Sequence, residues 1–93
     1  MRLAWTPEAT RSRNAVYDHI EADNPSAALA MDTLFRGSAM GLLEHPQMGR
    51  PGRIPRTREL VVHPSYVLVY DILGDTIRIL RLLHTSRQWP SSG

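Results

Sequence analysis

Four arginines lie close together in one loop, where their guanidinium groups could bind phosphates or carboxylates. The segment GRPGRIPRTREL contains the four, which are Arg50, Arg53, Arg56 and Arg58. Proline and glycine residues between them restrict the backbone, so the cluster could keep a fixed geometry and clamp an anionic partner. The alternative is that these arginines are solvated or pair with nearby acids such as Glu59.

A second group of reactive side chains follows the last apolar run of the chain: His84, Arg87 and Trp89. A histidine can act as a general acid or base near neutral pH, and an arginine can stabilise the charge of a phosphoryl transition state. The indole ring could stack on a nucleobase, so the three together could cleave RNA without a metal. The alternative is that His84 is a hydrogen-bonded structural residue and that Trp89 closes the edge of the core.

No other pattern in the chain indicates a catalytic or metal site. The chain contains no cysteine, and the remaining histidines, His19, His45 and His63, lack the spacing of zinc ligands. It also lacks a glycine-rich phosphate loop, a nucleophile elbow and a pair of catalytic carboxylates. We therefore expect no metal and no cofactor.

Length and charge restrict the class of protein. A chain of 93 residues predicts a single domain over residues 1–93 with a small core. Residues 1–49 hold four arginines and six acids, whereas residues 50–93 hold seven arginines and three acids, so the halves carry −2 and +4. The basic half indicates an acidic partner, either nucleic acid or an acidic protein surface. The absence of cysteine, signal peptide and long apolar run predicts a cytoplasmic protein.

Two helices and a set of strands must position these residues. Thr6-Pro7 and Asn24-Pro25 are helix start signals, and they predict helices over residues 7–22 and 25–43 that form a hairpin. Strands are expected over residues 2–5, 58–62, 66–72 and 76–83, with a tight turn at Gly74-Asp75. Prolines and glycines exclude regular structure from residues 45–57. The result is an α+β fold in which a helical hairpin packs on a small antiparallel sheet.

Both faces of this sheet are predicted to be partly apolar. Tyr66, Leu68 and Tyr70 share one face of the middle strand, whereas Val67 and Val69 share the other. Two helices form one layer and can cover only one face. A partner protein could cover the second face, or the segment that begins at His84 could fold back over it.

The blocks GRPGR, TREL, YVLVY and ILRLLH, followed by a tryptophan, resemble the RelE/ParE family of bacterial toxins and are most similar to its ParE branch. The resemblance covers nearly the whole chain and includes the Asn24-Pro25 helix junction. It implies the same α+β fold, and a toxin of a type II toxin-antitoxin system that is neutralised by a cognate antitoxin, whose flexible tail wraps the toxin.

The resemblance implies two different activities. RelE-like members are ribosome-dependent endoribonucleases that cut messenger RNA, whereas ParE-like members, known also from plasmid stabilisation, poison DNA gyrase. Ribonuclease members usually have an arginine where this chain has Val67, and often lysines where it has Arg58 and Leu60. Loss of the central arginine removes the group expected to neutralise the scissile phosphate.

We therefore predict a ParE-like gyrase inhibitor that acts by binding and forms a hetero-oligomer with its antitoxin. The predicted contact residues are Arg50, Arg53, Arg56, Arg58, Leu60, Val67, His84, Arg87 and Trp89. The alternatives are a ribosome-dependent endoribonuclease that uses Arg58, His84 and Arg87, and an inactive toxin retained as an antitoxin-binding module.

Overall fold

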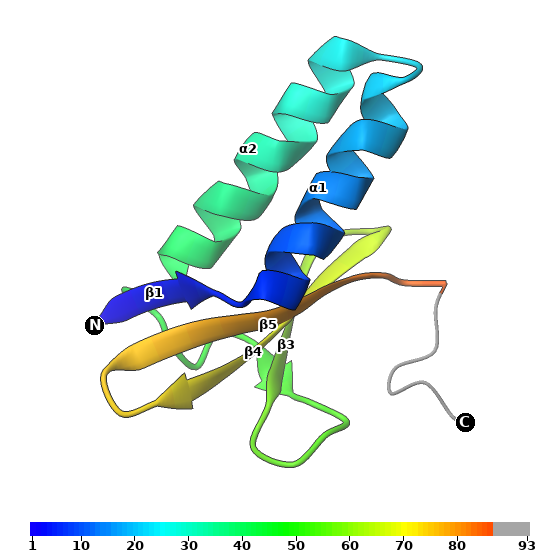
Figure 1. The fold of residues 1–93 in the computed structure, drawn as a ribbon. Coiled ribbons are helices and arrows are strands. Elements are labelled where there is room, and N and C mark those ends of the chain that lie inside the picture. The colour runs from blue at the N-terminus through cyan, green and yellow to red at the C-terminus, as the bar shows by residue number, and fades with distance from the viewer. Residues whose placement is uncertain (87–93) are drawn as a thin grey trace.

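The computed structural model describes residues 1–86, which form a helical hairpin on one side of a five-stranded sheet (Figure 1). In chain order the elements are β1 (Arg2–Trp5), α1 (Pro7–Glu21), α2 (Pro25–Gly41), β2 (Arg50–Pro51), β3 (Arg58–His63), β4 (Tyr66–Leu73) and β5 (Thr76–His84). The predicted α+β class is confirmed, and every predicted helix and strand is present within one or two residues of its expected ends. Neither helix in this part of the chain is long and apolar enough to cross a membrane.

Both helices begin at the predicted capping residues. The hydroxyl oxygen of Thr6 accepts a hydrogen bond from the backbone N–H of Ala9 (3.2 Å), and Pro7 follows at the first helical position. The amide oxygen of Asn24 accepts from the N–H of Ala27 (3.1 Å) in the same way. The Thr6 hydroxyl also donates to the carbonyl of Leu80 (3.2 Å), so the cap fixes the start of α1 against β5.

The strands lie in the order β1-β5-β4-β3-β2. β3, β4 and β5 form the predicted antiparallel meander, and Gly74 adopts a left-handed φ of 59° in the turn that joins β4 to β5. β1 pairs with β5 in parallel, which makes the sheet mixed. The parallel pairing arises because the helical hairpin returns the chain to the end of the sheet from which β1 started.

One prediction about the loop between α2 and β3 is wrong. Residues 45–57 were expected to lack regular structure, yet they contain the short strand β2, in which Arg50 pairs with Glu59 and Pro51 with Arg58. Proline is compatible with this position because β2 is an edge strand. Within the described part of the chain no further strand pairs with its outer side, so the missing N–H of Pro51 removes no hydrogen bond there. β2 therefore places the start of the arginine-rich loop directly beside β3.

The core lies between the hairpin and one face of the sheet. Leu68 and Tyr70 of β4 are fully buried against Phe35 of α2 and neighbouring apolar side chains. The pairing of β4 with β5 shifts between Val69, which faces Arg81, and Tyr70, which faces Ile79. This bulge inserts one extra residue into β5 and brings both Ile79 and Leu82 into the core, although they are three positions apart.

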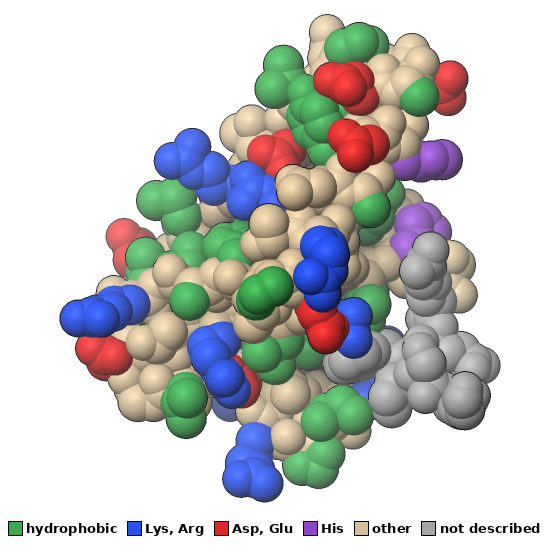
Figure 2. Space-filling view, in the orientation of Figure 1, with side chains coloured by type: hydrophobic (Ala, Val, Ile, Leu, Met, Phe, Trp, Pro, Cys, Tyr) green, Lys and Arg blue, Asp and Glu red, His purple; other side chains and the backbone are tan. Residues whose placement is uncertain are grey.

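The uneven division of charge along the sequence is also a division in space. On the face shown in Figure 2, acidic side chains without basic neighbours lie at the top, over the tip of the helical hairpin, whereas basic side chains lie lower and are mixed there with other acidic ones. The arginine-rich half of the chain supplies β3, β4, β5 and the loop before them. An anionic partner is therefore attracted toward the sheet end of the molecule.

Candidate functional site: an arginine pair on the second face of the sheet

The side of the sheet that faces away from the hairpin, called here the second face, carries a cavity of about 300 Å³. Its centre is Val67 of β4, whose register partners are Val61 of β3 and Leu83 of β5. Because successive side chains of a strand alternate between faces, Val67 points away from the core residue Leu68. The lining residues are Arg50, Arg53, Glu59, Val61, Val67, Leu83, His84 and Thr85.

Four of the predicted contact residues therefore meet in one place, although they are far apart in the sequence. Arg50 comes from β2, Arg53 from the loop that follows it, Val67 from β4 and His84 from the end of β5. The cavity combines cationic side chains with an apolar floor. Such a surface fits a ligand that carries both an acidic and an apolar group.

The carboxylate of Glu59 organises the two arginines. Its side chain is 2% exposed, and Arg50 Nη2 and Arg53 Nε lie 3.3 Å and 3.5 Å from its two oxygens. The backbone N–H of Arg53 also donates to Glu59 Oε2 (3.1 Å). The sequence alternative that these arginines pair with Glu59 is thus confirmed for Arg50 and Arg53. Their side chains remain 58% and 54% exposed, and the three groups together carry a charge of +1.

Arg58 has a different place and a different role. Its Nη1 donates to the carbonyl oxygen of Gly49 (2.7 Å) and, more weakly, to that of Gln47 (3.4 Å). The side chain therefore fixes the beginning of the arginine-rich loop and does not line the cavity. Charged donors on backbone carbonyls make stronger hydrogen bonds than neutral ones, so this contact is a firm anchor.

The remaining predicted residues are not brought to the cavity within the described part of the chain. Arg56 is exposed in the loop, where it has a left-handed φ of 69°. Leu60 pairs with Leu68 and packs against the core, so it lies on the opposite face from Val67. Arg87 and Trp89 lie outside the described residues, as does any return of the chain over the second face.

His84 is exposed at the end of β5 and has local partners. The backbone N–H of Ser86 donates to His84 Nδ1 (3.1 Å), and the Ser86 hydroxyl lies 2.7 Å from the same nitrogen. An Nδ1 that accepts an N–H carries no proton, so the neutral ring holds its proton on Nε2. The ring also contacts Tyr66 edge-to-face at 5.3 Å between centroids. His84 is thus oriented by its neighbours. It lines both the second-face cavity and a cavity of about 540 Å³ between α1 and the end of β5.

Sequence reasoning missed the residue that holds the loop to the sheet. Tyr70 is fully buried, and its hydroxyl donates to the carbonyl of Pro46 (2.7 Å) while it accepts from the N–H of Gly49 (3.0 Å). Strand alternation indicates only that Tyr70 points into the core. Its hydroxyl partners lie more than 20 positions earlier in the chain, and no local pattern reveals such a contact.

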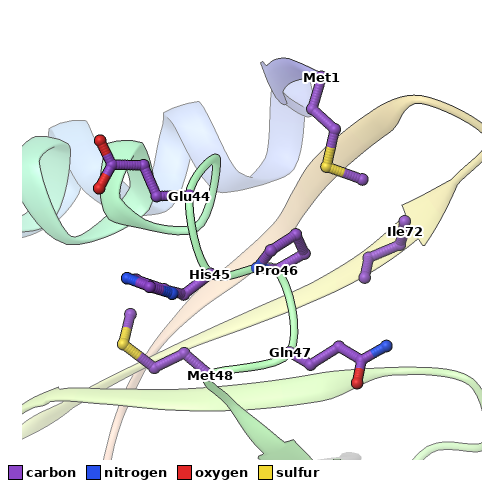
Figure 3. Close-up of a pocket in the computed structure, with 7 residues that line it drawn as sticks. All are labelled: Met1, Glu44, His45, Pro46, Gln47, Met48 and Ile72. Atoms are coloured by element: carbon purple, nitrogen blue, oxygen red, sulfur yellow. The ribbon is translucent and has the colours of Figure 1, made fainter.

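A larger cavity of about 690 Å³ lies between the chain start, the segment after α2 and β4, and its lining residues are Met1, Glu44, His45, Pro46, Gln47, Met48 and Ile72 (Figure 3). Met1 and Ile72 lie on one side of the Pro46 ring, and His45 and Met48 lie on the other. Among the described residues, neither an arginine nor a predicted contact residue lines this cavity. The cavity between α1 and β5 includes one of the described contact residues, His84, whereas the second face brings four of them together, so we assign the candidate site to the second face.

Residues 1–86 contain no group of three or more histidine, cysteine, aspartate or glutamate side chains that could hold a metal ion. The groups around the second-face cavity that could act on a ligand are the guanidinium groups of Arg50 and Arg53, the Glu59 carboxylate and the His84 ring. The guanidinium groups can bind anions.

Comparison with known proteins gives consistent matches. The family model described as the ParE toxin of the type II toxin-antitoxin system parDE matches residues 3–89. Y4kP of Sinorhizobium fredii, named as a toxin, is 39% identical over 90 residues, which is 96% of this chain and 93% of Y4kP. Toxin RelE2 of Caulobacter vibrioides is 34% identical over 86 residues, 92% of this chain and 97% of RelE2.

A solved structure described as the chromosomal ParDE TA system from P. aeruginosa has the same fold. Its matching chain superposes with a TM-score of 0.80 at 27% identity, and the match covers 90% of this chain and 95% of that one.

Proposed function

The chain belongs to the ParE toxin family of type II toxin-antitoxin systems, and from this membership we propose that it arrests bacterial growth by binding DNA gyrase. We further propose that a cognate antitoxin neutralises it by covering the second face of the sheet.

The residue at the centre of the second face supports a binding function over RNA cleavage. Val67 is 6% exposed and lies between two apolar register partners, Val61 and Leu83. The resemblance implies that ribonuclease members place an arginine there to neutralise the scissile phosphate. An apolar side chain cannot neutralise this charge. Electrostatic stabilisation of the transition state is usually the largest single contribution to catalysis.

The test uses bacterial cells that express the chain without an antitoxin. In the first minutes after induction, incorporation of labelled thymidine should fall before incorporation of labelled methionine, because gyrase inhibition stops replication first. The purified protein should also inhibit supercoiling by gyrase. An earlier fall of methionine incorporation, or no effect on supercoiling, would contradict the gyrase assignment.

A matched pair of variants locates the contact surface. Arg50→Gln/Arg53→Gln removes two charges from the cavity and should weaken both growth arrest and gyrase inhibition. Arg11→Gln/Arg36→Gln removes two charges from exposed positions on the helices and should leave both activities intact. Equal loss in the two double variants would mean that overall charge, and not this surface, attracts the target.

The cavity also supports the antitoxin proposal. Two half-exposed guanidinium groups over an apolar floor suit an acidic and apolar peptide segment. Co-expression with the product of the neighbouring antitoxin gene should yield a stable complex and restore growth. The Arg50→Gln/Arg53→Gln variant should bind that product more weakly than Arg11→Gln/Arg36→Gln does, and equal binding would place the antitoxin elsewhere.

One observation favours ribosome-dependent RNA cleavage as a second candidate. His84 lines the same cavity as Arg50 and Arg53, so a proton-transfer group lies beside two cations. Arg58, expected to take part in such a reaction, is instead bonded to Gly49. Messenger cleavage in induced cells that disappears in His84→Ala and Arg87→Ala would establish this candidate.

The third alternative is an inactive toxin retained as an antitoxin-binding module. It is favoured if incorporation of neither thymidine nor methionine falls after induction.

A further inference from the structure

Glu59 is a buried acid within a basic surface, and its burial requires an explanation. Taking a carboxylate out of water is costly unless nearby charges and hydrogen bonds compensate it. Glu59 is 3% exposed overall and obtains that compensation from one backbone N–H and two guanidinium groups. An apolar side chain of the same volume could fill this position without that cost. We therefore expect the main role of the carboxylate to be ordering the groups that it contacts, and not filling the core.

The groups that Glu59 contacts belong to a loop whose two ends are already fixed. Tyr70 and Arg58 hold the chain at Pro46 and Gly49 before the loop, and β3 begins at Arg58 after it. Within the loop, the N–H of Gly52 donates to the carbonyl of Thr57 (2.8 Å), which closes a turn on itself. Glu59 links Arg53 at the edge of this turn to the sheet.

The same carboxylate reaches both arginines, one through each oxygen. Oε1 receives Arg50 Nη2, and Oε2 receives the Arg53 backbone N–H and lies near Arg53 Nε. Each side chain keeps more than half of its surface accessible, so the contact orients the arginines without withdrawing them from a partner. A long side chain that is already ordered loses less conformational freedom when it binds.

We propose that Glu59 is a positioning residue of the second face, which holds Arg50 and Arg53 in a fixed arrangement over the apolar floor for contact with the protein target. This inference rests on the proposed function of that surface. Glu59 itself does not touch the target, and it acts through the two guanidinium groups.

The first test measures the arginines directly and needs no partner. In the free protein, the Nε–H groups of Arg53 and Arg50 are followed by ¹H–¹⁵N NMR, and their exchange with water is compared between wild type and Glu59→Gln. Exchange at Arg53 should become about fivefold to tenfold faster, as expected when a partly exposed, charge-assisted contact is lost. Glu8→Gln, which breaks the ion pair between Glu8 of α1 and Arg81 of β5, is the matched control and should leave Arg53 unchanged.

The second test compares growth arrest at equal protein levels. Glu59→Gln should weaken growth arrest by about as much as Arg50→Gln/Arg53→Gln does. The triple variant Arg50→Gln/Arg53→Gln/Glu59→Gln should arrest growth as well as that double variant, because the effects of residues that act as one unit are not additive. Glu59→Met keeps the volume without a buried charge and should behave like Glu59→Gln while remaining folded. A residue that only stabilised the fold would instead lower the melting temperature and give additive losses.

The outcomes separate the inference from the proposed function. If Arg50→Gln/Arg53→Gln arrests growth like wild type, the proposed role of the surface is wrong and the inference fails with it. If that double variant is weakened while folded Glu59→Gln and Glu59→Met arrest growth normally, the surface stands and the role of Glu59 is wrong. Unchanged exchange at Arg53 in both Glu59 variants would also overturn the inference.

Discussion

The backbone N–H of Gly49 donates a hydrogen bond to the buried hydroxyl of Tyr70, with 3.0 Å between the nitrogen and the oxygen. The approach is so close that a Cβ on residue 49 would lie 2.7 Å from Cε1 and 2.8 Å from the hydroxyl oxygen of that ring. The arginine-rich loop thus begins where its backbone touches the core. Only glycine permits this contact without displacing a ring that is fully buried.

The Gly49→Ala substitution is expected to destabilise the protein by about 1–3 kcal/mol, the usual cost of overpacking a filled core. Gly37→Ala is the matched control, because a Cβ at that exposed position in α2 meets nothing within 4 Å. Alanine is the better helix former, so this control should gain up to about 1 kcal/mol. Urea unfolding measures the free energy of unfolding of Gly49→Ala and Gly37→Ala. Equal changes in the two variants would contradict the close approach of Gly49 to Tyr70.

Local signals in the sequence were sufficient for the helices and the hairpin. Thr6-Pro7 and Asn24-Pro25 combine a capping side chain with a proline at the first helical position, and both signals act within a few residues. Gly74 likewise marks its turn locally. The alternation of side chains along β4 correctly predicted that Leu68 and Val67 lie on opposite faces of the sheet. Val67 thereby becomes part of the apolar floor of the second face.

Contacts between distant residues account for what the sequence did not reveal. The strand β2 exists because Arg50 pairs across to Glu59, and the extra residue in β5 follows from packing of Ile79 and Leu82 under the helices. The sequence predicts pairing of these arginines with Glu59 only as an alternative to a cluster that clamps an anionic partner. Its geometry, with one carboxylate between two arginines, depends on the fold of the whole loop.

A bidentate ion pair joins the two helices and predicts a dependence of stability on pH. Arg13 Nε and Nη2 donate to the two oxygens of Asp32 at 2.6 Å and 2.9 Å. The hydrogen bonds from Arg13 lower the pKa of Asp32 below its ordinary value. A lowered folded-state pKa means that the ionised carboxylate stabilises the fold above its unfolded-state pKa, and that this contribution is lost as the pH falls through the folded-state pKa.

Asp32→Asn should therefore lower the free energy of unfolding by about 0.5–1 kcal/mol at pH 7, a value discounted for the partial exposure of the pair. The difference from wild type should narrow as the pH falls below about 4, where Asp32 of the unfolded chain takes up a proton, and should vanish below the lower pKa of the folded state. Asp18→Asn makes the same change at an exposed position on α1 and should have little effect at either pH. A constant difference between Asp32→Asn and wild type down to pH 2 would refute the ion-pair explanation.

Arg56 has a backbone conformation that its side chain does not favour. Its φ of 69° lies in the left-handed region, which costs a residue with a Cβ roughly 1–2 kcal/mol, whereas asparagine tolerates this region better. Arg56→Asn should thus be neutral or stabilise the protein by up to about 1 kcal/mol, and Arg56→Val should destabilise it, because a β-branched residue fits a positive φ poorly. Urea unfolding of both variants measures these differences.

Residues in strained backbone conformations cluster at functional sites, and the Arg56 side chain is exposed. We therefore expect Arg56→Asn to weaken growth arrest although the variant is at least as stable as wild type, a combination that loss of folding cannot produce. Arg36→Asn, at an exposed position on α2, controls for the loss of one positive charge and should arrest growth normally. Full arrest by a stable Arg56→Asn would remove Arg56 from the contact surface and leave Arg50 and Arg53 as the loop's proposed contacts.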